Sequence, residues 1–155
     1  MLEAFPRVGV DGARLLLAGP GEVGPLPPDI EYLGVVDHSA VPDLLRRSAI
    51  AWIPLRRHGN YDRAVPTKLV EAMAMGRPVV ASDLPRMAAI VRATGCGIVV
   101  PFDDPDAHAA AIRDLLQDPD RARAMGASGR RAFLDGMAFE NEADALTSFY
   151  EEVLG

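Results

Sequence analysis

Short apolar runs alternate with amphipathic segments along this chain of 155 residues. The apolar runs show no polar alternation, which is typical of strands buried on both faces of a parallel sheet. Predicted strands cover residues 14–18, 30–36, 49–55, 78–82 and 97–101, and predicted helices cover residues 41–48, 66–75, 85–94, 105–116, 119–133 and 139–154, with the tail of a further helix over residues 1–8. The sequence therefore predicts an α/β fold: a Rossmann-like parallel sheet with helices on both faces.

Residues that start and stop helices support these boundaries. Pro66 suits a first helical position, and Gly76 suits a left-handed helix end. Asp104 and Asp118 each precede a proline, as N-cap residues do. The single tryptophan, Trp52, lies within a predicted strand and is interpreted as a core residue rather than a stacking platform.

Composition indicates one domain over residues 1–155. Hydrophobic residues make up 49% of the chain, enough for one core. No apolar run reaches the roughly 20 residues that span a bilayer. The single Cys96 can form no internal disulfide, which fits a cytoplasmic protein.

Charge is unevenly distributed. The net charge of −6 disfavours nucleic-acid binding. The stretch from residue 44 to 69, however, carries six basic residues and one acidic residue, Asp62. Such a basic segment in an acidic protein suggests a small anion as ligand, and an ordinary solvated face remains the alternative.

One nucleotide-binding motif matches in its sequence pattern but lacks the structural context that the motif requires. Gly19, Gly21 and Gly24 form G-x-G-x-x-G after a predicted strand, and Asp37 ends the next strand. The prolines at positions 25, 27 and 28 oppose the helix that the motif requires. A dinucleotide-dependent oxidoreductase is therefore disfavoured. Gly19 and Gly21 either allow a ligand close to the backbone or form a plain turn.

The helix predicted to begin at Pro66 carries the candidate chemistry. Its start should leave the N–H groups of Thr67, Lys68 and Leu69 unpaired, and such a start attracts anions. Lys68 is the only lysine of the chain and would add a positive charge there. A surface lysine without a ligand is the alternative.

Glu71 is the only polar residue between Leu69 and Met75, so we expect a largely buried helix and a buried carboxylate. The two hydroxyls of a ribose would match its two oxygens, and an internal ion pair with an arginine is the alternative. Together these features favour a nucleoside diphosphate ligand. No acidic or histidine cluster has metal-ligand spacing, and His38, His58 and His108 are interpreted as surface residues.

The run from Pro66 to Ser82, PTKLVEAMAMGRPVVAS, resembles the donor-site signature of glycosyltransferase family 4, retaining enzymes of GT-B fold. The segments 14–22, 30–36 and 97–101 and the helical tail follow the order of that family's C-terminal half. The resemblance implies a hexose-like sugar transferred from a nucleoside diphosphate sugar. Because no cluster has metal-ligand spacing, we expect no metal, and we expect no other cofactor. It implies that Lys68 and Glu71 are catalytic, and that the donor nucleotide contacts Gly19, Gly21, Val36, Asp37, Pro66, Thr67, Lys68, Leu69 and Glu71. Arg57 and Arg63 are further candidate contacts to phosphate or sugar.

Two departures from the family pattern matter. Arg63 occupies the position of the family's first donor-site glutamate. The N-terminal acceptor domain and the first strand of the C-terminal half have no counterpart, so we expect a fragment that is inactive alone, with two strand edges left unpaired unless the gap closes or another chain fills it.

These departures leave a second interpretation open: a non-catalytic nucleotide-binding or dimerisation module. The last predicted helix would offer an apolar face for a homodimer or for the acceptor domain, made of Phe139, Ala143, Leu146, Phe149 and Val153. Peripheral membrane contact is expected only through the acceptor domain.

Overall fold

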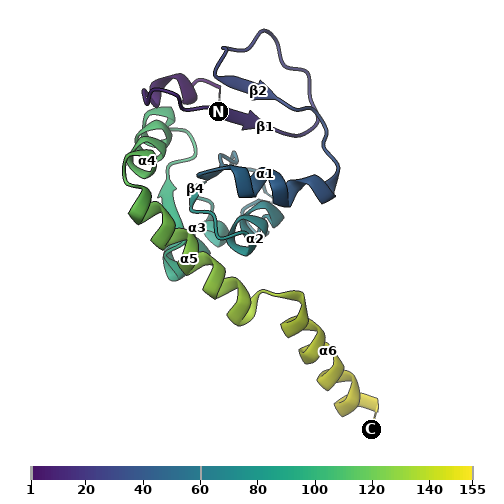
Figure 1. Ribbon diagram of the computed structural model, residues 1–155. Helices are drawn as coiled ribbons and strands as arrows, with labels where there is room; N and C mark the ends of the chain where they lie inside the picture. Colours follow the sequence, from purple (N-terminus) through teal and green to yellow (C-terminus); the bar gives the residue numbers. More distant parts are fainter. Residues whose placement is uncertain (1, 60, 155) are drawn as a thin grey trace.

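The structure is a computed structural model that describes residues 2–59 and 61–154; the side chains of residues 139–142, 144 and 145 are not described. It has the expected α/β order (Figure 1). The strands are β1 (Leu15–Leu17), β2 (Ile30–Tyr32), β3 (Ala51–Ile53), β4 (Val79–Ser82) and β5 (Gly97–Val100). The helices are α1 (Val41–Arg47), α2 (Thr67–Ala74), α3 (Pro85–Thr94), α4 (Pro105–Gln117), α5 (Pro119–Gly136) and α6 (Phe139–Leu154), with short 3₁₀ turns η1 (Phe5–Arg7) and η2 (His38–Ala40).

The strands form two separate parallel sheets. β1 pairs with β2, with Leu16 opposite Glu31. β3, β4 and β5 form the second sheet, with Val80 between Trp52 and Ile98. A single continuous sheet is therefore not formed among the described residues. The predicted pair of unpaired strand edges is confirmed, because β1 and β3 each have a neighbour on one side only.

Helices cover both faces of the three-stranded sheet, as predicted. On one face, Ala51, Ile53 and Ala81 pack with buried residues of α2 and α3. On the other face, Val80 and Val100 pack with α4 and with Phe5 of η1. The alternation of side chains along β3 and β4 supplies both cores.

Glycines allow α5 to pack closely against the sheet layer. A Cβ at Gly126 would lie 2.2 Å from the carbonyl oxygen of Gly76, and one at Gly129 would lie 2.9 Å from the Cβ of Cys96. Gly76 itself has φ 62°, the left-handed conformation predicted for the residue that ends α2. This contact brings the end of α2 against the middle of α5.

Most predicted boundaries agree with the structure, and the differences lie at the ends of elements. The strands are shorter than predicted, although backbone hydrogen bonds continue beyond β1 and β2, where the N–H of Leu33 donates to Leu17 and the N–H of Gly19 donates to Gly34. The predicted helix tail at residues 1–8 is a 3₁₀ turn in which Phe5 is buried and Leu2 is 42% exposed; Met1 lies outside the described residues. Asp104 and Asp118 cap α4 and α5 by accepting hydrogen bonds from the N–H groups of Ala107 and Arg121.

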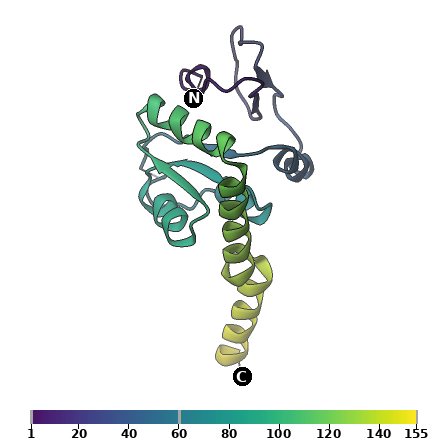
Figure 2. The same ribbon diagram turned by 60° about the vertical axis from the view of Figure 1, so that its left-hand side comes forward.

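Helix α6 extends away from the rest of the molecule, as both ribbon views show (Figure 2). Among its described side chains, five large apolar ones are more than half exposed: Leu146, Phe149, Tyr150, Val153 and Leu154. The exposure expected for Leu146, Phe149 and Val153 is confirmed, while the side chain of Phe139 lies outside the described part. None of the described helices is long and apolar enough to cross a membrane.

Candidate functional site

The start of α2 offers two free backbone donors. Pro66 is the N-cap residue with extended backbone, so the helix begins at Thr67, one residue later than predicted. The N–H of Leu69 donates to the carbonyl of Pro66 at 2.9 Å, which corrects the prediction that it is unpaired. Among the described residues, the N–H groups of Thr67 and Lys68 have no acceptor. These two groups point out of the helix start, where the helix dipole favours an anion.

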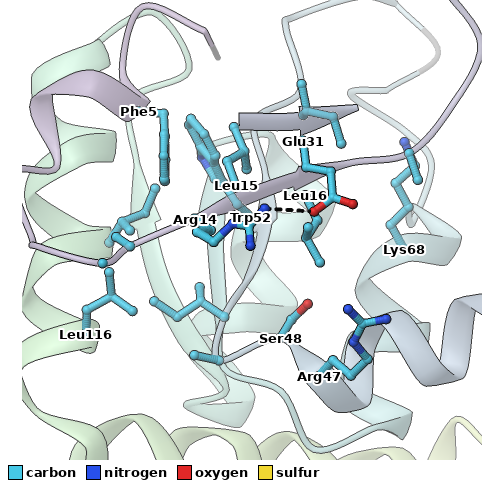
Figure 3. A pocket seen from close by; sticks show the side chains of 17 residues that line it. Phe5, Arg14, Leu15, Leu16, Glu31, Arg47, Ser48, Trp52, Lys68 and Leu116 are labelled. Atoms are coloured by element: carbon cyan, nitrogen blue, oxygen red, sulfur yellow. Dashed lines mark hydrogen bonds and ion pairs between the residues drawn. The ribbon is translucent and has the colours of Figure 1, made fainter. Parts of the chain in front are cut away.

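Lys68 lies at this helix start with its side chain exposed, and no acidic side chain of the described residues pairs with it. It lines a cavity of about 570 Å³ together with Leu17 and Ala18 at the end of β1. Figure 3 shows its side chain at the edge of this cavity. An unpaired ammonium group beside two free N–H groups makes this end of α2 a suitable place for a diphosphate.

Glu71 lies one helical turn after Lys68 and has a different environment from the predicted one. Its side chain is 29% exposed, because α2 buries only one face, that of Leu69, Ala72 and Met73. No arginine pairs with it among the described residues. Its Oε1 lies 3.2 Å from Nε2 of His38 instead. The carboxylate is therefore accessible to a ligand.

The contact with His38 brings the end of the second predicted strand to α2. Asp37 caps η2 by accepting hydrogen bonds from the N–H of Ser39 at 2.8 Å and from its hydroxyl at 2.5 Å. These hydrogen bonds lower the pKa of Asp37 below its ordinary value. Val36 is half-buried beside it. Of these residues, His38 contacts Glu71, and Val36 and Asp37, which the resemblance places by the base, directly precede it in the chain.

Gly19 and Gly21 lie in a hydrogen-bonded loop after β1. Their φ values are 144° and 143°, a region that favours glycine. The hydroxyl oxygen of Tyr32 lies 2.8 Å from the carbonyl oxygens of both glycines and can donate its one proton to either, and the N–H of Gly19 donates to Gly34. No other atom lies within 4 Å of a Cβ built at either position. The loop is open on its outer side. No helix follows Gly24 before β2, which supports the rejection of the dinucleotide motif.

The two candidate arginines lie in the loop before α2. Arg57 pairs with Asp62 at 3.5 Å within the same loop, and its side chain is 62% exposed. Arg63 is exposed. The structure places neither side chain in contact with Lys68 or Glu71, so their role as phosphate or sugar contacts stays a prediction.

Histidines are the residues that sequence reasoning placed least well. His58 is exposed and stacks edge-on against Tyr61. His38 is a surface residue as predicted, but its contact with Glu71 was missed. His108 is 3% exposed and accepts a hydrogen bond from the indole of Trp52 at 3.0 Å, so the prediction of a surface residue is wrong. The rule that ligands bind at the carboxyl ends of strands places His38 with Asp37 at that edge of the sheet, but it does not predict the contact with Glu71.

No group of three or more metal-ligating side chains lies together in the part of the chain that the structure describes. The first turns of α2 instead carry two N–H donors, the ammonium group of Lys68 and one acceptor, the carboxylate of Glu71. This set matches a nucleoside diphosphate. Its phosphates need cations and N–H donors, and its ribose hydroxyls need a hydrogen-bond acceptor.

Comparison with known proteins decides the family. The family model described as glycosyl transferases group 1 matches residues 1–118, which include the whole of α2 and residues 36–38. The chain belongs to the glycosyl transferases group 1 family. The family resemblance of the Pro66–Ser82 motif is thereby confirmed.

Curated relatives of this group 1 domain include proteins named as glycosyltransferases. A phosphatidyl-myo-inositol mannosyltransferase from Mycobacterium tuberculosis is 33% identical over 125 residues, covering 75% of this chain and 32% of the relative. A lipopolysaccharide core biosynthesis mannosyltransferase from Rhizobium meliloti is 30% identical over 124 residues, covering 79% of this chain and 34% of the relative. The chain thus spans about a third of the length of these relatives.

A solved structure supports the fold. Sucrose-phosphate synthase from Thermosynechococcus elongatus matches with a TM-score of 0.82 at 22% identity, over 99% of this chain and 41% of that chain. The α/β architecture with parallel sheets flanked by helices, predicted from the sequence, is that of part of a GT-B glycosyltransferase.

Proposed function

We propose that this chain is the donor-binding half of a retaining glycosyltransferase that transfers a hexose-like sugar from a nucleoside diphosphate sugar to an acceptor. The observation that carries the proposal is the arrangement on α2. Two free N–H groups and the ammonium group of Lys68 lie at the helix start, one turn from the accessible carboxylate of Glu71. One helix can thus hold both the diphosphate and the ribose of a nucleoside diphosphate.

Each residue has a role in this proposal. The free N–H groups of Thr67 and Lys68, which follow Pro66, bind the diphosphate together with the Lys68 side chain. Glu71 accepts hydrogen bonds from the ribose hydroxyls. Residues 36 and 37 lie beside the base, and the Gly19–Gly21 loop lets the donor approach the backbone.

The chemical contribution of this half is stabilisation of the leaving group. Negative charge develops on the diphosphate as the glycosidic bond breaks. Donors and a cation already aimed at that charge lower the barrier without reorganising during the reaction. Leu69 takes part through position only, since its side chain is fully buried and its N–H is already bonded.

Nucleotide binding tests the proposal directly. We expect one of UDP, GDP, ADP and TDP to raise the thermal midpoint, because a ligand at a hundredfold excess over Kd stabilises the folded state by about 2.7 kcal/mol. Glu71→Ala should reduce the shift by removing the ribose acceptor, and Lys68→Gln should reduce it by removing a diphosphate contact. The corresponding nucleoside has no phosphate, so Lys68→Gln should not change the midpoint shift that the nucleoside causes.

Matched controls separate binding from stability. Glu152→Ala removes an exposed carboxylate on α6, and Arg92→Gln removes an exposed cation on α3. Neither should change the midpoint shift. If all four nucleotides leave the wild-type midpoint unchanged, or if Glu71→Ala and Lys68→Gln respond like the controls, the proposed donor site is wrong.

A second candidate function is a non-catalytic association module. The observation in its favour is the exposed apolar face of α6, with Phe149 and Val153 both more than half exposed. Self-association without affinity for any nucleoside diphosphate would favour this function over the donor-binding half.

A further inference from the structure

A second cavity, of about 660 Å³, lies at the end of α2 that is opposite to Lys68. Its walls come from Ala49 just before β3, from residues 75–78 between α2 and β4, and from the ends of α4 and α5 that meet at Pro119. Ala49 and Pro78 precede their strands, whereas Lys68 lies beyond the carboxyl end of β3. The length of α2, about 12 Å, separates this cavity from the proposed donor site.

Arginines supply the charge of this cavity. Among the described residues that line it, the charged side chains are Arg77, Arg123 and Arg130. Arg123 pairs with Asp120 on the same helix. No carboxylate of the described residues pairs with Arg77 or Arg130. In a chain with a net charge of −6, this cavity thus carries two positive charges without an acidic partner.

Arg77 is held in place by two carbonyl groups. Its Nε donates to the carbonyl of Met75 at 3.2 Å, and its Nη1 donates to the carbonyl of Ser48 at 3.1 Å. These bonds use two of the five N–H donors of a guanidinium group. The carbonyl groups orient the guanidinium of this half-buried side chain without neutralising it, so its remaining donors suit an anion.

Arg130 reaches the same end of α2 from α5. Its Nη1 donates to the carbonyl of Ala74, and its guanidinium carbon lies 5.8 Å from the ring centre of Phe133. Both contacts restrain a side chain that is otherwise exposed. Less side-chain freedom is then lost when an anion binds.

The remaining wall of the cavity is largely apolar. Leu115, Pro78 and Ala122 are buried in it, and Leu116 is half-buried. The volume lies within the range of about 300–1,000 Å³ that is typical of small-molecule sites. Two fixed cations beside an apolar wall therefore suit a ligand that has an anionic group and an organic body.

We propose that this cavity binds a small organic phosphate monoester, with its phosphate held by Arg77 and Arg130 and its organic body packed against Leu116 and Ala122. Guanidinium groups bind phosphate oxygens in pairs and keep their charge at physiological pH. A phosphate monoester carries a charge of about −1.5 to −2 at neutral pH, which matches two arginines better than a carboxylate does. The site is separate from the donor site and does not rest on the proposed function.

Phenyl phosphate is a suitable probe, because it joins a phosphate monoester to an apolar ring. In an NMR titration we expect the amide signals of Leu116, Ala122 and Ala127 to shift with one common Kd. This Kd should be lower than that of inorganic phosphate, because the ring buries apolar surface of the cavity. The amides of Thr67 and Lys68 report separately on any phosphate bound at the donor site.

Arg130→Gln tests the role of the cation in a side chain that is exposed enough to be replaced without unfolding the protein. The Kd of phenyl phosphate should rise by about tenfold, as the loss of a hydrogen bond between charged groups predicts. Arg131→Gln is the matched control, because it removes the same charge from the next residue of α5, which is exposed and does not line the cavity. Its Kd should change by less than about twofold, because solvent and salt screen the distant charge. Arg77→Lys keeps the charge but loses the paired donors, so it should also weaken binding.

Three results would overturn the proposal. Equal Kd values for Arg130→Gln and Arg131→Gln would show unspecific attraction to a basic surface. Shifts confined to Thr67 and Lys68 would place the phosphate in the donor site alone. Sedimentation with phosphatidic acid vesicles without any response to phenyl phosphate would assign the arginines to a membrane surface.

Lys68→Gln separates this proposal from the proposed function. It should reduce the midpoint shift caused by a nucleoside diphosphate and leave the Kd of phenyl phosphate at Leu116 and Ala122 unchanged. Failure of the donor site would therefore leave the result at this cavity intact, and the reverse also holds.

Discussion

His108 places a titratable group inside the apolar layer between β3 and α4. Its Nδ1 accepts the indole N–H of Trp52, and its Nε2 is buried with no partner among the described residues. Burial lowers the pKa of His108 below its ordinary value of 6.5, although the carboxylate of Asp104 opposes the shift. A neutral imidazole is thus built into the folded state.

This arrangement predicts a loss of stability in acid. As pH falls below about 6.5, the unfolded chain takes up a proton at His108 before the folded chain does, so the free energy of unfolding decreases until the folded pKa is passed. His108→Gln keeps an acceptor for Trp52 and should flatten this dependence. Urea unfolding at neutral and mildly acidic pH measures it.

The control for this prediction is His58→Gln, at an exposed histidine. It should leave the acid dependence of the wild type in place. Equal loss of stability in acid for the wild type and for His108→Gln would show that His108 does not cause it.

At the residue scale, sequence reasoning succeeded where a residue type matched its local position. Lys68 at a helix start and the caps Asp104 and Asp118 are examples. It failed for Glu71 and His108, because exposure depends on which face of α2 or α4 the rest of the chain covers. The pairing of His38 with Glu71 joins residues 33 positions apart, and no local pattern contains it.

At the scale of elements, the packing of α5 on α2 depends on the absence of a side chain. Helix α5 carries Gly126 in its interior, where glycine costs about 0.5–1 kcal/mol relative to alanine. The carbonyl of Gly76 occupies the space that a Cβ would need. Close approach of the two helices therefore outweighs helix propensity at this position.

Gly126→Ala should consequently destabilise the protein by about 1 to 3 kcal/mol, as overpacking does, instead of stabilising the helix. Gly136→Ala is the matched control on the same helix, since nothing lies within 4 Å of a Cβ there. It should be neutral or stabilising by less than about 1 kcal/mol. Denaturant unfolding of both variants measures the difference, and equal effects would contradict the close contact.

At the scale of the whole molecule, the described apolar side chains of α6 are left uncovered. The helix projects beyond the body of the domain in both views (Figures 1 and 2). Exposed apolar residues gathered on one helix are typical of an association surface. The proposed association function rests on this face of α6.

We expect the chain alone to self-associate through α6. Light scattering during size-exclusion chromatography should show a mass that rises with protein concentration. Replacing Phe149 and Val153 by serine should reduce this rise, because both side chains are more than half exposed and apolar. Glu151→Ser with Glu152→Ser on the same helix is the control, and a monomer at all concentrations would contradict the prediction.

The order of elements, their parallel α/β class and the candidate helix with Thr67, Lys68 and Glu71 were determined by the sequence alone. The reason is that periodicity, caps and prolines act over a few neighbouring residues. Tertiary structure alone decided the rest. It left the carboxylate of Glu71 accessible and placed it beside His38. It buried His108 next to Trp52, and it divided the strands into two sheets that both line one cavity. These features depend on contacts between segments far apart in the chain, and no local pattern records which backbone edge or helix face those contacts will cover.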